Sequence, residues 1–193
     1  MPSNAELFSH IRVLISLVVG LGLTRLLTGI ARIIQHPRAK PVYGVHLVWV
    51  LFVFVTLVQF WWWEFRLASI DAWNFEYYLF IILYITLYFL ACTLLFPDNM
   101  DDYSDYRDYF LSRRAWFFGF LAAIFVLDFG DTLIKGQAYF ASLGWEYFAR
   151  NAAFVALCLV AMRSRSLRFH VAFAWLAIAY ELTWVVRHYQ TVA

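Results

Sequence analysis

Residues 117–135 read FFGFLAAIFVLDFGDTLIK, an apolar run that is long enough to cross a lipid bilayer. The run nevertheless carries two acids, Asp128 and Asp131, within one turn of a helix. A carboxylate at membrane depth is costly, so it needs a charged partner, a proton or a water-filled cavity. The stretch therefore predicts a membrane helix whose charged side chains depend on partners from the other helices.

The composition of the whole chain agrees with a membrane protein. Of its 193 residues, 64% are hydrophobic and only 15% are charged, whereas an average soluble domain has roughly 45–50% apolar and about 25% charged residues. A globule of this size leaves much of its surface exposed and cannot hide such an excess. The bilayer is therefore the predicted partner. The net charge of +2 gives no indication of a nucleic-acid partner.

Apolar runs of membrane-spanning length recur along the entire chain, and only short, turn-rich gaps separate them. We predict an all-α polytopic membrane protein that forms one domain, a bundle of six transmembrane helices, with a homo-oligomer as a plausible assembly. The predicted spans are approximately 8–34, 43–65, 75–96, 115–135, 145–163 and 167–189.

Basic residues near the ends of the spans predict the orientation in the membrane. One side carries nine of them: Arg32, Arg38, Lys40, Arg107, Arg113, Arg114, Arg163, Arg165 and Arg168. The other side carries four: Arg12, Arg66, Lys135 and Arg187. Because basic loops stay in the cytoplasm, we expect a plasma-membrane protein of the bacterial inner-membrane type with both termini on the non-cytoplasmic side.

The two aspartates of the opening stretch differ in how easily they are explained. Asp131 and Lys135 are spaced i, i+4 on a helix, which predicts an ion pair near the outer interface. Asp128 lies deeper and has no comparable partner within its own helix. We therefore interpret Asp128 as the stronger candidate for proton or cation handling, and keep Asp131 as a further candidate.

Titratable residues also line up in the last span. His170, Glu181 and His188 fall on one face of the predicted helix, together with the small residues Ala174 and Ala177. Proton relays in membranes are built from such Asp, Glu and His series. The alternative is structural: the histidines lie at the interfaces, and Glu181 makes a single salt bridge.

The fifth span supplies a counter-charge, Arg150, in its outer third. Judged by depth alone, Arg150 is expected to meet Asp128 and Glu181, with Arg12 and Gln59 nearby, in the outer half of the bundle. Opposite charges would then compensate one another, as buried charges generally require. Such a cluster serves either as structural glue or as the wall of a water-filled pocket.

The cytoplasmic side offers two further candidates. Arg25 lies inside the first span and is expected to contact an anion, a lipid headgroup or the acidic loop after the third span. That loop contains Asp98, Asp101 and Asp105, a DxxDxxxD spacing used by membrane prenyltransferases to hold Mg²⁺ and a diphosphate. The chain has fewer spans than that family and lacks a second aspartate-rich loop, so we do not infer membership. A solvated loop is the alternative to a metal site.

Two kinds of cofactor remain open from the sequence, Mg²⁺ at the acidic loop and haem. His46 with His170, and His10 with His188, lie toward the same sides and are potential ligand pairs for b-type haem, although histidines are also ordinary residues at span ends. No GxSxG, HExxH, P-loop or Gly-rich dinucleotide motif occurs in the sequence.

These patterns support three hypotheses. The first is a small transporter or channel for protons, cations or a small cationic solute, with Asp128 and Glu181 as titrating groups, Arg150 as counter-charge, and His170 and His188 as relay positions. The second is a lipid-modifying membrane enzyme that holds a metal in its acidic cytoplasmic loop. The third is a non-catalytic accessory or assembly subunit whose buried charges only set how the helices pack.

Overall fold

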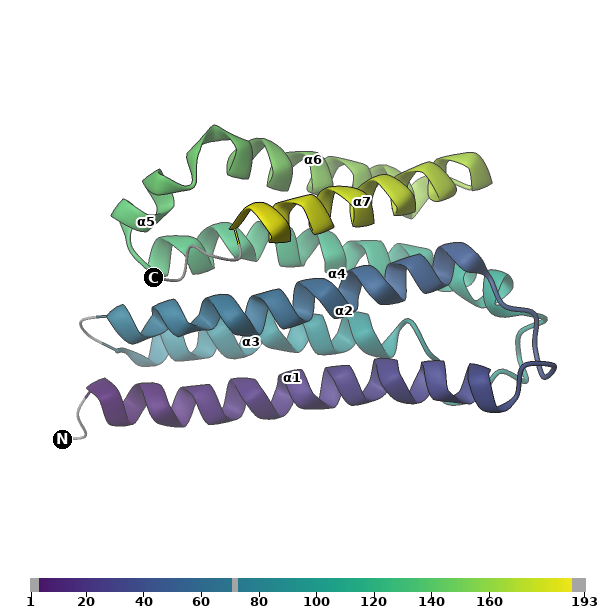
Figure 1. The fold of residues 1–193 in the computed structure, drawn as a ribbon, viewed down its shortest axis with the longest axis horizontal. Coiled ribbons are helices and arrows are strands. Elements are labelled where there is room, and N and C mark those ends of the chain that lie inside the picture. The colour runs from purple at the N-terminus through teal and green to yellow at the C-terminus, as the bar shows by residue number, and fades with distance from the viewer. Residues whose placement is uncertain (1–3, 71–72, 189–193) are drawn as a thin grey trace.

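The computed structural model describes residues 4–70 and 73–188, and within these ranges the chain is helical with no strand. Figure 1 shows the helices lying side by side along the long axis of the molecule. The elements are α1 (Asn4–Gln35), α2 (Gly44–Trp63), the 3₁₀ helix η1 (Glu64–Ser69), α3 (Phe75–Thr93), α4 (Tyr106–Ile134), α5 (Gln137–Ser142), α6 (Gly144–Arg163) and α7 (Leu167–His188).

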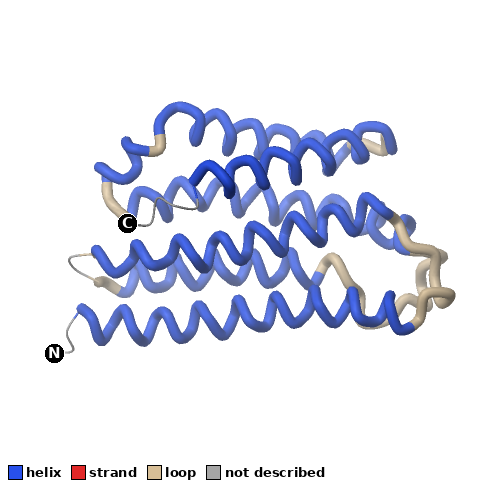
Figure 2. Tube along the Cα trace, in the orientation of Figure 1, coloured by secondary structure: helices blue, strands red, loops and turns tan. Residues whose placement is uncertain are grey.

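The long helices alternate in direction, so the connections gather at two ends of the bundle (Figures 1 and 2). We call the end that holds the start of α1 and the end of α7 the proximal end. It also holds η1, α5 and the start of α3. The distal end holds the loops at 36–43, 94–105 and 164–166. The described parts of the first and last helices therefore reach the same end.

Packing between the helices places α4 near the centre of the bundle. This helix packs most extensively against α6 on one side and α3 on the other, while α1 packs on α3 and α2, and α2 packs on α7. In Figure 1, α1 and α6 accordingly lie at opposite edges of the bundle. Charged side chains on α4 can therefore contact groups from several other helices.

The distal half of the core is closed by aromatic rings. Trp49 of α2 is fully buried, and its ring centroid lies 5.0 Å from that of Phe173 on α7 and 5.2 Å from that of Phe118 on α4. Phe52 and Phe117 lie against the same indole at 5.3 and 5.7 Å. These mostly edge-on contacts are favourable for aromatic pairs and fill the interior. We call these five residues the aromatic floor.

The outer surface of the bundle is rich in exposed apolar side chains, which on α7 include Trp175, Leu176 and Val186. Within residues 4–70 and 73–188, five helical segments are long and apolar enough to cross a membrane: Glu6–Gln35 in α1, Gly44–Ser69 with α2 and η1, and the helices α3, α4 and α7. These features support a multi-pass membrane protein. The remaining long helix, α6, has 20 residues, but Glu146, Arg150 and Asn151 near its start lower its mean hydropathy.

Some boundaries differ from those expected. α4 begins at Tyr106, not near residue 115, because Asp105 caps it: its carboxylate accepts a hydrogen bond of 2.7 Å from the amide of Asp108. The third span was expected to reach residue 96, but α3 ends at Thr93. The predicted gap before residue 145 contains α5, which is flanked by Gly136 and Gly144 in the left-handed region, with φ of 117° and 68°.

One glycine of α1 permits a very close contact with the turn that follows α3. A Cβ atom added at Gly29 would lie 2.1 Å from Cγ of Phe96, far closer than two carbons can approach. By contrast, a Cβ atom at Gly20 on the same helix would meet nothing within 4 Å. Gly29 is thus needed for the seating of the Phe96 ring, which sets how α1 packs at the distal end.

Candidate functional site

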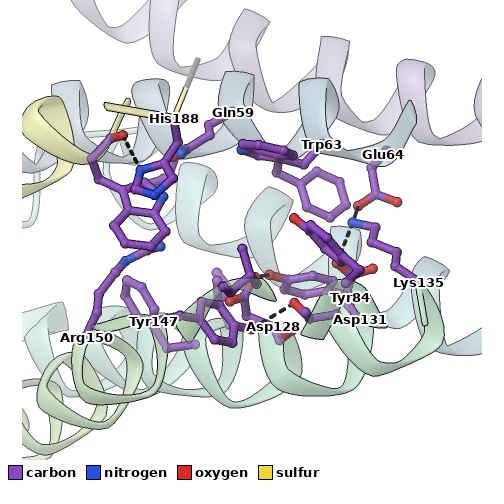
Figure 3. A pocket seen from close by; sticks show the side chains of 18 of the residues that line it. Gln59, Trp63, Glu64, Tyr84, Asp128, Asp131, Lys135, Tyr147, Arg150 and His188 are labelled. Atoms are coloured by element: carbon purple, nitrogen blue, oxygen red, sulfur yellow. Dashed lines mark hydrogen bonds and ion pairs between the residues drawn. The ribbon is translucent and has the colours of Figure 1, made fainter. Parts of the chain in front are cut away.

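A cavity of about 70 Å³ lies in the proximal half of the bundle, between α2, α3, α4, α6 and α7. We call it the polar pocket, and it is large enough for ordered water. Figure 3 shows its charged side chains converging from separate helices, with Glu64 and Lys135 toward one end and Arg150 and His188 toward the other. The polar residues that line it include Gln59, Glu64, Tyr84, Asp128, Asp131, Lys135, Tyr147, Arg150 and His188.

The first charged group in the pocket is a buried triad. Nζ of Lys135 donates to Oδ2 of Asp131 at 2.6 Å and to Oε1 of Glu64 at 2.8 Å. All three side chains are buried, with no more than 5% of each exposed. The expected Asp131–Lys135 pair is present, but it lies inside the bundle and is bridged to η1. One ammonium group therefore neutralises only part of the charge of two buried carboxylates.

Asp128 lies beside the triad and uses both of its carboxylate oxygens. Oδ1 accepts a hydrogen bond from the Tyr84 hydroxyl at 3.2 Å, and Oδ2 accepts one from Nδ2 of Asn151 at 2.7 Å. The Tyr147 hydroxyl donates to the main-chain oxygen of Asp128 at 3.0 Å. These partners come from α3 and α6 and are neutral, so none of them supplies a positive charge to the Asp128 carboxylate.

Arg150 and Glu181 form the second charged group. Nη2 of Arg150 lies 3.6 Å from Oε2 of Glu181, whose side chain is fully buried. The guanidinium also lies over the ring of Trp184, with Cζ 4.6 Å from the ring centroid, as in a cation–π contact. The predicted meeting of Asp128, Arg150, Glu181 and Gln59 is thus reproduced in outline, because Gln59 lines the same pocket.

Arg12, by contrast, is directed elsewhere. Its guanidinium lies over the ring of Phe65, 4.2 Å from the centroid, on the outside of the bundle. A separate small cavity of about 10 Å³ is lined by Arg12 and by the far side of Glu64. The expectation that Arg12 joins Asp128 and Arg150 is therefore wrong, because α1 lies at the edge of the bundle and packs on α2 and α3.

Several buried polar atoms around the pocket lack a hydrogen-bond partner in the described part of the chain. They are Oε2 of Glu64, Oδ1 of Asp131, Nε of Arg150, Oδ1 of Asn151 and both carboxylate oxygens of Glu181. Buried oxygens without partners are costly, and they mark places where a proton, a water or a ligand cation can bind.

The charges at the pocket do not balance. Four acids, Glu64, Asp128, Asp131 and Glu181, lie close to two fixed cations, Lys135 and Arg150. Arg66 of η1 stacks over Tyr139 at 4.4 Å, and His188 also lines the cavity. The four acids thus outnumber the two cations Lys135 and Arg150, which favours the uptake of protons or of a positively charged ligand.

The two histidines of the predicted relay lie at different ends. His188 lines the pocket, where its ring stacks on Trp184 at 4.0 Å and Nδ1 donates to that residue's carbonyl oxygen at 3.0 Å. His170 is fully buried at the distal end, where Nε2 donates to the carbonyl oxygen of Ser164 at 3.0 Å and the ring stacks on Phe118. The aromatic floor separates His170 from the pocket.

The distal candidates have individual structural roles. Nη2 of Arg25 contacts Oδ1 of Asp98 at 2.5 Å and the carbonyl oxygen of Phe96 at 3.0 Å, which matches the predicted contact with the acidic loop. Asp101 accepts from the side chain of Asn99 at 2.7 Å, and Asp105 caps α4. Residues 4–70 and 73–188 contain no group of three His, Cys, Asp or Glu side chains placed to hold a metal.

The structure does not support the two histidine pairs that were considered as haem ligands. Nε2 of His46 donates to the carbonyl oxygen of Leu95, and its ring stacks on Tyr106. His170 uses its own Nε2 for Ser164. The remaining candidate of the proximal pair, His10, lies exposed on α1.

Glu64 is the charged site residue that the sequence reasoning missed, and Tyr84 and Tyr147 are missed neutral partners of Asp128. Glu64 follows Trp61-Trp62-Trp63 at the end of the second span, a place where an acid at the interface attracts no notice. The available signal was that Glu64 is the only acid in the predicted span 43–65. Its burial results from η1, which continues α2 inward by one 3₁₀ segment and turns the carboxylate toward Lys135.

Comparisons with known proteins give no relative: no family model, no curated protein and no solved structure matches this chain. The geometry of the polar pocket therefore carries the functional argument by itself.

Proposed function

We propose that this protein is a plasma-membrane protein with six spans that moves protons, cations or a small cationic solute through its polar pocket. The sixth span in this proposal is α6, which has the length of α2 and packs extensively on α4. The charged residues in its proximal half pair with α7, since Arg150 contacts Glu181 and Glu146 contacts Arg187 at 2.6 Å. The proximal end is the non-cytoplasmic side, as the basic residues indicate.

The excess of buried acid at the polar pocket is the observation that carries the proposal. Glu64 and Asp131 each expose 5% of the side chain and each keep one oxygen without a hydrogen-bond donor. Asp128, held by neutral partners, adds a further negative charge at the centre of the cavity. A proton or a cation binding there offsets this charge, and ionisable groups of this kind mark ion pathways in membranes.

Each residue has a specific role in this proposal. Asp128 and Glu181 are the groups that take up and release the cation or proton, with Asp131 as a secondary site. Arg150 contacts Glu181 and lines the same cavity as Asp128, and it tunes both through its charge. His188 is a gate at the proximal side of the pocket, whereas His170 serves the distal half, where passage requires the aromatic floor to open.

Flux measurements on purified protein in liposomes test this function. Asp128→Asn and Glu181→Gln keep the side-chain shapes but remove the charges, and we expect each to lose most of the cation or proton flux. Glu146→Gln is the matched control, because Glu146 is an acid at the proximal surface whose partner is the exposed Arg187. Equal flux through the parent and both pocket variants would remove the basis of the proposal.

The accessory-subunit alternative is favoured by one observation. The same charges join separate elements: Lys135 ties α4 to η1, and Arg150 contacts α7 from α6. If these charges serve only packing, Asp128→Asn and Glu181→Gln will lower thermal stability or break a complex without changing any flux. Thermal unfolding measured beside the flux assay separates the two functions.

The metal-dependent enzyme alternative is not favoured, since Asp98, Asp101 and Asp105 are each engaged in a different local contact. It makes a simple prediction of its own, namely that Mg²⁺ binds at the acidic loop. Isothermal titration calorimetry with Mg²⁺ on the parent and on Asp101→Asn checks it. We expect no heat of Mg²⁺ binding from either protein.

A further inference from the structure

The polar pocket shares three wall residues with an apolar groove on the outside of the bundle. The groove runs along α2 and the end of α7, has a volume of about 340 Å³, and is lined by apolar side chains that include Phe54, Val58 and Val185. Gln59, Trp63 and His188 line both the groove and the pocket. Figure 3 shows these three side chains together along the α2 side of the pocket. They form the partition between the two spaces.

We propose that the ligand of the polar pocket is an amphipathic amine, with its ammonium head in the pocket and its hydrocarbon chain in the groove. This inference rests on the proposed function, because it names the class of cation that the site takes. The head passes between Gln59, Trp63 and His188, and the chain stays on the membrane-facing side of them. The ligand thus enters sideways from the bilayer.

The walls of the pocket suit an ammonium group better than a bare metal ion. The pocket already holds one ammonium, that of Lys135, at 2.6 and 2.8 Å from two carboxylates. Its remaining walls are largely aromatic, among them Trp63, Tyr84 and Trp184, whose faces attract organic cations. The described ranges hold no group of three metal-ligating side chains. Carboxylates combined with rings therefore indicate an organic cation.

The groove accounts for the other half of the ligand. Val58 is 42% exposed on the outer surface of α2, so the groove is open to lipid. A fully polar amine makes no use of it, whereas each methylene of an alkyl chain laid in such a groove adds favourable burial. The adjoining acid-rich pocket decides between occupants, because the head of a neutral lipid offers at most a hydrogen bond and no compensating charge, and an anionic head is repelled.

Native mass spectrometry of the detergent-solubilised protein tests this inference with three probes: dodecylammonium, dodecanol and butylammonium. We expect the parent to retain one dodecylammonium, and to retain dodecanol and butylammonium at least about tenfold less well. Asp131→Asn leaves the Lys135–Glu64 contact in place and removes one negative charge from the pocket. It should weaken the binding of dodecylammonium by about tenfold. If Asp131→Asn folds poorly, Asp128→Asn provides a second test in which one pocket carboxylate loses its charge.

A pair of tryptophan variants tests the groove. Val58→Trp fills it and should reduce dodecylammonium binding to the level of butylammonium. Leu51→Trp is the control, since Leu51 is 48% exposed and lies two turns away on the same face of α2, outside the groove. Glu146→Gln controls for loss of a surface acid.

Three results would overturn the inference: equal retention of dodecanol and dodecylammonium, equal effects of the two tryptophan variants, or no effect of either pocket acid. The binding assay and the flux assay are independent. Parent flux of protons or inorganic cations without dodecylammonium binding refutes the amphipathic ligand but leaves the proposed function standing. Specific dodecylammonium binding without any flux refutes transport and leaves the site assignment intact.

Discussion

Nζ of Lys135 lies 2.8 Å from Oε1 of Glu64, and neither side chain exposes more than 5% of its surface. This contact joins the C-terminal cap of α4 to the 3₁₀ helix that follows α2, two places that are far apart in the sequence. Together with Asp131 it makes a triad in which one cation serves two acids. The triad both supports the proximal end and contributes to the negative charge of the pocket.

Removing the cation from this triad should be strongly destabilising. Lys135→Met leaves two buried carboxylates without their ammonium partner, and the loss of one partner of a buried ion pair costs about 3–5 kcal/mol. Thermal unfolding in detergent measures the effect. Arg187→Met is the matched control: its partner Glu146 is 39% exposed, and exposed ion pairs contribute little to stability because solvent screens them. Equal losses from the two variants would contradict the buried triad.

The Arg150–Glu181 contact should behave as a coupled pair. Arg150→Met leaves Glu181 buried and charged without its cation, so the variant loses stability, and adding Glu181→Gln should recover part of that loss. A double-mutant cycle on thermal stability gives the coupling, which we expect to be about 1–3 kcal/mol. Arg150→Lys should be less stable than the parent protein, because an ammonium lacks the flat face that stacks on Trp184. Simple additivity would show that the two side chains do not interact.

A methyl group at Gly29 should disturb the distal end. Gly29→Ala places a carbon inside the ring of Phe96, and overpacking of this kind typically costs about 1–3 kcal/mol. Gly20→Ala on the same helix meets nothing within 4 Å and should be neutral or stabilising. Phe96→Ala combined with Gly29→Ala should lose less than the sum of the single changes. The measurement is again thermal unfolding, with the Gly20 variant run in parallel.

The orientation of the chain can be checked by labelling cysteines in intact cells. The native Cys92 and Cys158 are fully buried, so single cysteines introduced at exposed positions near the ends of the bundle report alone. With a membrane-impermeant maleimide, we expect Ser69→Cys at the proximal end to react from outside and Ala39→Cys at the distal end to react only after lysis. The reverse pattern would place the polar pocket on the cytoplasmic side.

The sequence anticipated more of the fold than of the site. Hydropathy located the five helical segments of the described residues that are long and apolar enough to cross a membrane, because a stretch of some twenty apolar residues has few other stable arrangements. The remaining predicted span, 145–163, corresponds to α6, which is a helix of 20 residues with a lower mean hydropathy. The depth of each charge also predicted that Asp128, Arg150 and Gln59 meet. Depth carries no information about the position of a helix around the bundle, however, which is why Arg12 was wrongly included.

Glu64 was missed for a different reason. Its burial depends on a short 3₁₀ segment that directs the carboxylate inward, and no hydrophobic period marks such a segment. The limit of α4 was likewise misplaced, since the cap at Asp105 starts the helix within a polar stretch that hydropathy treats as loop. Local hydrogen bonding decided both cases, and apolar patterning reports little about it.

The aromatic floor also sets the kinetic regime of any passage through the bundle. Five closely packed rings fill the core at this level, so in the proposed transport a solute has to wait until this packing rearranges, a collective motion of microseconds to milliseconds. The rate of solute uptake should therefore saturate with solute concentration and fall steeply on cooling. A carrier that transports one solute in each conformational cycle behaves in this way. Continuous single-channel currents are not expected from such an interior.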